Sequence, residues 1–147
     1  MALLAKIDEK ATIQNVKDFF NSDFERIQRL SKSNINISSP RIDGMPKIRP
    51  VNNVNENKYI KAANFRLAFK AVIDAVNDCS DTGRVIIIKR LIQHKPQWQV
   101  AQEVQYQSSR YYDYYNDACL EFADNLEYRT AILGDDDLLL DLHAYQD

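Results

Sequence analysis

The sequence contains few of the residues that interrupt helices. Only three glycines and four prolines occur in 147 residues, a composition that disfavours turn-rich β structure and favours helices. So few glycines leave no glycine-rich loop for a nucleotide phosphate. The two cysteines, Cys79 and Cys119, are far apart and form no CxxC motif, so neither a zinc site nor a redox pair is indicated. We expect both to be buried free thiols.

Catalytic patterns are equally scarce. The two histidines, His94 and His143, are distant in the sequence, and neither has a nearby cysteine or serine in a nucleophile pattern. The acidic run at 135–137 does not indicate a metal site, because consecutive side chains on a helix diverge. We therefore expect a protein that is not an enzyme and that has no cofactor or metal.

No segment has the pattern of a targeting or membrane-spanning sequence. The N-terminal stretch MALLAKIDEK becomes charged too early for a signal peptide, and no apolar run is long enough to cross a bilayer. This predicts a cytoplasmic protein without membrane contact. The formal net charge of -2 means that any affinity for DNA must come from a local basic surface.

Apolar residues recur at helical spacing along most of the chain, which predicts an all-α fold. Residues 1–30 form an N-terminal amphipathic helix, with Thr12 as a candidate cap, that packs either on its own domain or as an arm on a second protomer. Residues 31–57 hold three prolines and predict a flexible linker, whose SPRIDGMPKIRP motif either follows a phosphate backbone or is solvated. Residues 58–128 form the main helical domain. The acidic tail, residues 129–147, is either a short amphipathic helix that docks on a protein or a final helix that closes the core and is followed by a frayed end.

Residues 82–94 contain the run VIIIKRLI, which fits either a buried strand or a helix. We choose the helix, because the apolar positions keep helical spacing and the run is long for a strand. Its cations form an auxiliary basic patch that either meets phosphates or is solvated: Arg84, Lys89 and Arg90.

Residues 96–123 have the layout of a helix-turn-helix. Residues 98–104 form a short helix after Pro96, and residues 105–107 form the turn. Ser108 and Ser109 are candidate caps for the longer second helix. The apolar stripe of that helix consists of Tyr111, Tyr114, Ala118 and Phe122. The second helix of such a pair can enter a DNA major groove, although most packed helix pairs in all-α domains bind no DNA.

The other face of the second helix carries hydrogen-bonding side chains: Ser109, Arg110, Tyr112, Asp113 and Asn116. On DNA, Asn116 suits adenine, and Arg110 suits guanine or a phosphate. Four more residues are expected near the DNA backbone: Lys95, Trp98, Gln99 and Ser108.

Four stretches occur in order along the chain: IDEKATIQNVKDFF, SPRIDGMPK, WQVA and ACLEFA. In these stretches, and over nearly the whole length to residue 126, the sequence resembles the ArpU family of phage late-gene transcriptional regulators. Residues 81–123 also resemble the promoter-reading region 4 of bacterial sigma factors, and the related RinA-type activators share this architecture. The resemblance implies a sigma-like protein that binds late promoter DNA. It would activate packaging, morphogenesis and lysis genes together with the host RNA polymerase.

The sequence departs from the family pattern in the turn and in the second helix. Gln105 stands where the family usually has glycine, so we expect an awkward left-handed backbone there. Gln107 replaces the usual serine, which moves the cap to Ser108. Where the family tends to be basic, this chain has Tyr115 followed by Asn116 and Asp117, which leaves Arg110 as the only cation of the reading helix.

This shortage of positive charge supports a second hypothesis. The chain would be a phage adaptor whose helix-turn-helix and acidic tail bind protein, either RNA polymerase or a repressor, instead of DNA. The five tyrosines between positions 106 and 115 also predict a homodimer interface, because consecutive helix positions point in different directions and some of them must be exposed.

Overall fold

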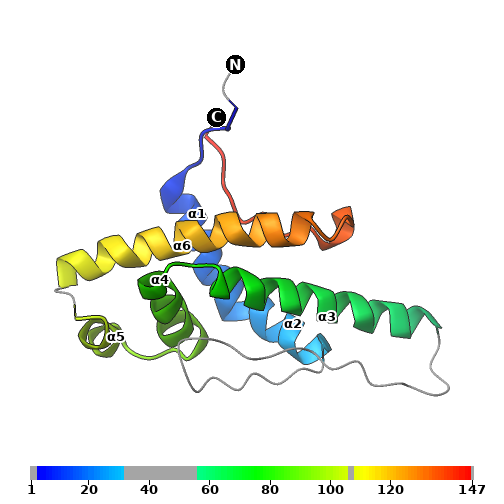
Figure 1. Ribbon diagram of the computed structural model, residues 1–147, viewed down its shortest axis with the longest axis horizontal. Coiled ribbons are helices and arrows are strands. Elements are labelled where there is room, and N and C mark those ends of the chain that lie inside the picture. The colour runs from blue at the N-terminus through cyan, green and yellow to red at the C-terminus, as the bar shows by residue number, and fades with distance from the viewer. Residues whose placement is uncertain (1–2, 32–55, 106–107, 147) are drawn as a thin grey trace.

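The computed structural model of the protein describes residues 3–31, 56–105 and 108–146 (Figure 1). These residues form helices and no strand, so the all-α prediction is confirmed. The elements, in chain order, are α1 (Glu9–Asp18), the π-helix η1 (Phe19–Asp23), α2 (Phe24–Ser31), α3 (Glu56–Asn77), α4 (Asp81–Ile86), the π-helix η2 (Ile87–Ile92), α5 (Gln97–Glu103), α6 (Ser108–Ala131) and the 3-10 helix η3 (Asp136–Leu138). No described helix combines the length and the apolar character needed to cross a membrane. The predicted linker, including SPRIDGMPKIRP, lies outside the described residues except for its two ends.

The first helix is capped by Asp8 and not by Thr12. The Asp8 carboxylate accepts a hydrogen bond from the amide of Ala11 at 3.1 Å. Thr12 lies inside the helix, where its hydroxyl donates to the carbonyl of Asp8 at 2.8 Å. A cap must stand ahead of the first turn to reach its unpaired amides, and Thr12 stands too late in the chain to do so.

The segments α1, η1 and α2 form one continuous rod with a π turn in the middle. Its wider turn lets two consecutive side chains, Phe19 and Phe20, face the core, where they are 2% and 1% exposed. The ring of Phe20 lies 4.8 Å from that of Phe122 in α6, and the ring of Phe24 lies 6.0 Å from that of Phe69 in α3. The hypothesis that this helix is an arm for a second protomer therefore loses its basis, because its aromatic residues are covered within the chain.

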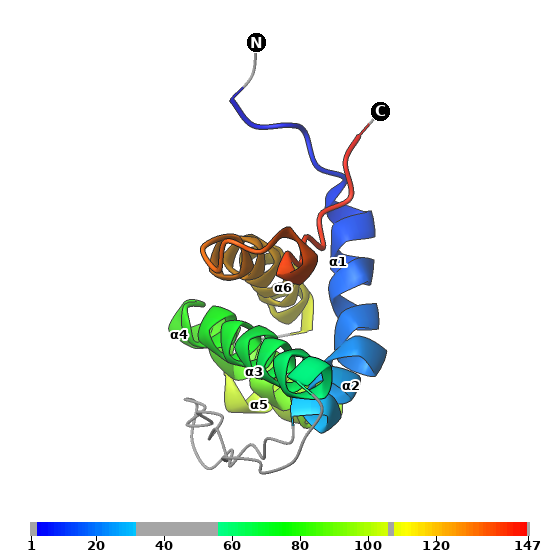
Figure 2. The same ribbon diagram turned by 90° about the vertical axis from the view of Figure 1, so that its right-hand side faces the viewer.

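The helices α3 and α6 run side by side in opposite directions, and the rod made by α1 and α2 crosses them (Figures 1 and 2). One cluster of buried side chains joins all these helices, and its largest members include Phe19, Phe20, Phe69, Ile86, Ile87, Ile88, Tyr111, Phe122 and Leu126. The predicted N-terminal helix and the predicted main domain thus share a single core.

The run that fits either a strand or a helix is helical, as predicted. Three consecutive isoleucines, Ile86, Ile87 and Ile88, are at most 1% exposed because α4 and η2 lie in the middle of the fold. The Ser80 hydroxyl caps α4 by accepting from the amide of Gly83, and the carboxylate of Glu121 in α6 accepts from the amide of Ser80 at 2.8 Å. A Cβ on Gly83 would come within 3.0 Å of Glu121, so glycine permits this close approach of α4 to α6.

The C-terminal tail is neither a docking helix nor a frayed end. After the short helix η3 it runs in extended form back to α1, and Leu140 and Leu142 pack on the core. The amide of Ala144 donates to the Thr12 hydroxyl at 3.0 Å, and its carbonyl accepts from the amide of Asp8 at 2.7 Å. The two ends of the described chain consequently lie together, as Figure 1 shows. The expectation of a helical tail is wrong because these backbone groups pair with α1 and not within a helix of their own.

Candidate nucleic-acid interface

The helix-turn-helix is formed by α5 and α6, within one residue of the predicted start of each helix. Pro96, with an extended backbone, precedes α5, and α5 ends before Val104. Gln105 adopts a φ of 61°, the left-handed conformation that the sequence predicts for this turn position. The second helix begins at Ser108, as expected, but extends to Ala131. The serine caps lie outside what the structure describes, because the side chains of Ser108 and Ser109 are not placed.

The buried side of the helix pair holds it against the core. Val100 in α5 is fully buried, and Ala101 and Val104 pack beside it. In α6, the predicted stripe residues Tyr111, Ala118 and Phe122 are at most 2% exposed, and Tyr114 packs on the same cluster. Tyr115, which directly precedes Asn116 and Asp117 on α6, is buried as well. Burial of Tyr111 and Tyr115 removes both from the tyrosine surface expected to form a homodimer.

The predicted reading face lies on the surface. Arg110, Tyr112, Asp113 and Asn116 are all exposed along the first half of α6. The hydroxyl of Tyr112 donates to the side-chain oxygen of Gln97 at 3.0 Å, which ties this face to the start of α5. Four of the side chains that the sequence reasoning assigned to base contacts therefore share one surface, and the side chain of the fifth, Ser109, is not described.

Trp98 does not belong to the scaffold. Its side chain is 65% exposed on α5, whereas the neighbouring Val100 fills the core. The sequence predicts Trp98 near the DNA backbone, and this exposure is compatible with that role. Gln99 and Lys95, the other predicted backbone contacts from this region, are half-buried.

The auxiliary basic patch is largely engaged in internal contacts. Arg84 pairs with Asp81 at 2.6 Å and donates to two backbone carbonyls, so its side chain is only 15% exposed. Lys89 and Lys95 both face the carboxylate of Glu103, at 3.2 and 3.7 Å. Partial burial would raise the pKa of Glu103, but these two lysines outweigh it and hold the pKa below its usual range. The patch therefore offers less free positive charge than its sequence indicates.

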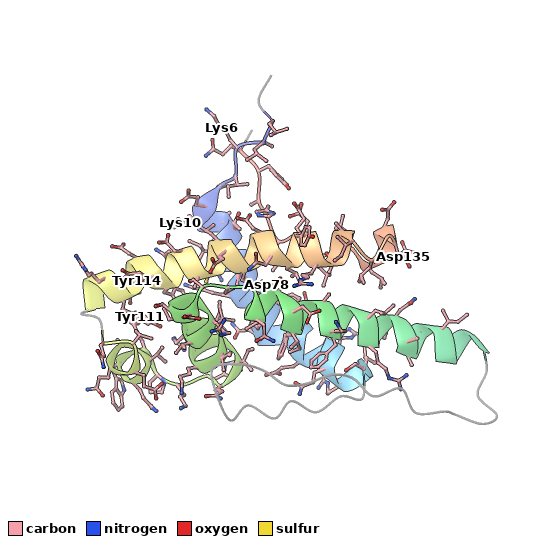
Figure 3. The ribbon with its side chains drawn as sticks, viewed as in Figure 1. Lys6, Lys10, Asp78, Tyr111, Tyr114 and Asp135 are labelled. Atoms are coloured by element: carbon pink, nitrogen blue, oxygen red, sulfur yellow. The ribbon has the colours of Figure 1, made fainter. Side chains whose placement is uncertain are left out.

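Cations that the sequence reasoning did not assign to the interface come from α1. Lys10 and Lys17 line a depression that also includes Glu9 of the same helix and Asn116 of the reading face. Figure 3 shows Lys10 above the first half of α6. The polar face of α1 is visible in the sequence, but nothing local indicates that it lies beside the second helix of the motif. The N-terminal rod thus brings positive charge to a reading helix that has little of its own.

A second polar cluster holds the tail in place. The ring of His143, 6% exposed, bridges Asp141 through Nδ1 at 2.6 Å and Asp124 through Nε2 at 2.7 Å. Burial alone would lower the pKa of His143, but the hydrogen bonds to the two aspartates outweigh it and raise that pKa. Potential metal-binding atoms of Glu127, Asp141 and His143 lie within 4.8 Å of one another. Both ring nitrogens already face carboxylates, which fits a protonated histidine joining α6 to the tail.

The two cysteines are free and buried, as predicted. Burial raises the pKa of each thiol to about 12, and the negative charge of Glu121 adds to the rise at Cys79. Neither thiol is therefore a nucleophile at neutral pH.

No family model matches the chain, and no curated protein or solved structure was found to match it.

Proposed function

We propose that the protein is a sequence-specific DNA-binding regulator that reads a duplex with the exposed face of α6. The observation that carries the proposal is the position of Arg110, Tyr112, Asp113 and Asn116 on one surface of the second helix of a packed helix-turn-helix. Such a helix fits a major groove, where side chains at these spacings can contact base edges.

Each exposed residue has a role that follows from its chemistry. Asn116 can pair with the hydrogen-bonding edge of adenine, and Arg110 can donate to guanine or to a phosphate. Trp98 and Lys95 on or before α5 would lie along the phosphate backbone. Lys17 from α1 borders the same surface and adds to the attraction for DNA.

The biological setting rests on the resemblance to the ArpU family. In that setting the protein activates phage or prophage late genes together with the host RNA polymerase. Two acidic residues, Asp113 on the reading surface and the exposed Asp117 farther along α6, limit non-specific attraction to DNA. A dimer or a contact with the polymerase would add the remaining affinity.

A selection of binding sites from random duplex DNA tests this proposal, since the selection itself identifies the target. The expected result is an enriched motif, bound with an affinity that falls steeply as salt rises. Arg110→Ala should weaken binding to that motif and relax its sequence preference at one position by roughly tenfold or more. Lys61→Gln on α3 is the matched control for lost charge and should leave binding unchanged. Absence of an enriched motif would contradict the proposal.

The second candidate is an adaptor that binds protein. The exposed acids Asp113 and Asp117 on α6 favour it, because a carboxylate repels phosphates and attracts basic protein surfaces. Under this alternative, the selection yields no motif. Asp113→Asn would then weaken the capture of purified RNA polymerase by the protein, while Arg110→Ala would not change the affinity of the protein for DNA.

A further inference from the structure

A cavity of about 320 Å³ lies where the N-terminal rod meets the helix-turn-helix. Lys17 and Asn21 line it from α1 and η1, Arg90 from η2, and Tyr111 and Tyr115 from α6. The volume is at the small end of the range for ligand pockets and far exceeds the roughly 30 Å³ of a single water. The cavity is therefore large enough for a small ligand or for one group of a larger one.

Two cations line this cavity, and neither takes part in an ion pair among the described residues. Lys17 lies with its ammonium 5.4 Å from the ring centre of Tyr115, a cation–π contact that does not neutralise its charge as a carboxylate would. The guanidinium of Arg90 donates to the backbone carbonyl of Lys95 at 3.4 Å. His94, also in the lining, faces Glu25 at 3.6 Å. Partly buried positive charge without a carboxylate partner favours an anion at this place.

A buried hydroxyl in the same lining also lacks a partner. Tyr111 is 1% exposed, and no described atom forms a hydrogen bond with its hydroxyl. Burial raises the pKa of Tyr111, and Arg90 is near enough for its charge to oppose that rise, although the pair does not reach hydrogen-bond geometry. Buried hydroxyls nearly always have a partner, so this one indicates an acceptor atom that occupies the cavity when the site is filled.

We propose that the cavity binds a phosphate group, with Lys17, Arg90 and the Tyr111 hydroxyl as its donors. A phosphate offers several acceptor oxygens to donors from three different elements. The charge of inorganic phosphate or of a phosphate monoester, about -1.5 to -2, balances the two cations, whereas a phosphodiester of the DNA backbone carries a single negative charge. A carboxylate has two oxygens and a single charge, so it satisfies this set less completely.

Two sources can deliver such a group: the backbone of bound DNA or a free phosphorylated small molecule. Tyr112 and Gln97, which join the two helices of the motif, also line the cavity, so either source would contact the helix-turn-helix. Only the DNA source rests on the proposed function.

The test uses the full chain and inorganic phosphate, with resonances of cavity residues followed by nuclear magnetic resonance at constant ionic strength. Phosphate should shift Tyr111 and Tyr115, whereas chloride should not. Arg90→Gln and Lys17→Gln should each weaken phosphate binding by about tenfold or more, since each removes a charged donor. Lys61→Gln should have no effect. Phosphate binding by both cavity variants that is as tight as that of the wild type, or no shift in the wild type, would overturn the proposal.

Tyr111→Phe is a second variant that keeps the proposal testable if Arg90→Gln or Lys17→Gln does not fold. It keeps the buried ring, removes only the unpartnered hydroxyl, and should weaken phosphate binding while the circular dichroism spectrum stays unchanged. If a folded Tyr111→Phe protein bound phosphate with unaltered affinity, the hydroxyl would not be a donor to the phosphate, and the proposal would be contradicted.

Titrations with selected duplex DNA separate the two sources. If DNA supplies the group, inorganic phosphate competes with the duplex. The double variant Lys17→Gln/Arg90→Gln then flattens the slope of log affinity against log salt by about one, because one phosphate is no longer neutralised. If a free molecule supplies it, the double variant loses phosphate binding but keeps its affinity for DNA. A wild-type protein that binds phosphate at the cavity and binds no DNA refutes the proposed function and supports this inference.

Discussion

The contacts of His143 with Asp141 and Asp124, here called the clasp, join the C-terminal tail to α6. They predict how the stability of the fold changes when His143 is replaced and when the pH rises. His143→Asn removes the cation that lies between Asp141 on the tail and Asp124 on α6. It leaves these carboxylates and Glu127 close together without a positive charge among them. We expect the tail to loosen from α6 and α1 and the whole fold to lose stability.

The size of the effect follows from the two hydrogen bonds of the ring. A hydrogen bond to a charged group is worth about 1.5 to 3 kcal/mol, and the 2.6 Å contact with Asp141, whose side chain is 29% exposed, belongs in this range. Asp124 is 71% exposed, so solvent reduces that contact to about 1 kcal/mol or less. The variant should therefore lose about 2 to 3 kcal/mol in the free energy of unfolding below neutral pH.

The pH dependence has a definite sign. The folded pKa of His143 is raised, so its contribution is fully present below the unfolded value of about 6.5 and is lost as pH rises through the folded pKa. The lowered pKa of Asp141 has the opposite sense, since its contribution is lost only as pH falls through a value below its ordinary one. Between about pH 6 and pH 9, the histidine term therefore dominates the difference between wild type and variant.

Urea unfolding at about pH 6 and about pH 9 measures this difference, on either side of the ordinary histidine pKa of 6.5. The gap between wild type and His143→Asn should be largest at the lower pH and shrink at the higher. His94→Asn is the matched control: His94 is half-exposed, faces Glu25 at 3.6 Å, and has a left-handed backbone that Asn tolerates. An equal gap at both pH values would refute the proposed charge state of His143.

Three further predictions concern the core, the turn and the cysteines. Phe122→Ala should lower the free energy of unfolding by about 3 to 5 kcal/mol, because the ring is fully buried, whereas Tyr112→Ala at the surface should cost far less; urea titration measures both. Gln105→Gly should raise the midpoint of thermal unfolding, because the left-handed backbone costs glutamine about 1 kcal/mol and glycine adopts it without that cost; a lower midpoint would contradict the observed φ. Cys79 and Cys119 should react with a thiol reagent only as fast as the protein unfolds, because both are buried with pKa values near 12; fast labelling of folded protein would contradict this.

Local patterns in the sequence predict much of the fold. The spacing of apolar residues gives the helices of the motif, and Gln105 occupies the expected left-handed turn. These features depend on a few neighbouring residues, which is why the sequence alone is informative about them.

The candidate site is less predictable because its charges depend on contacts between distant elements. Lys89 appears free in the sequence, yet Glu103 on the next helix pairs with it. Lys17 lies far from Asn116 in the chain but lines the same depression. His143 has no catalytic or structural signal of its own, and it becomes a clasp only because the tail returns to α1 and α6. No local periodicity contains this information.

The measurement that tests the central claim most directly is a map of backbone amide shifts when a selected DNA duplex is added to the labelled protein. The account predicts the largest shifts at Arg110, Tyr112, Asp113 and Asn116 on α6, with a second group at Lys17 on α1. Shifts confined to α3 and the C-terminal tail, with the first half of α6 unchanged, would contradict it.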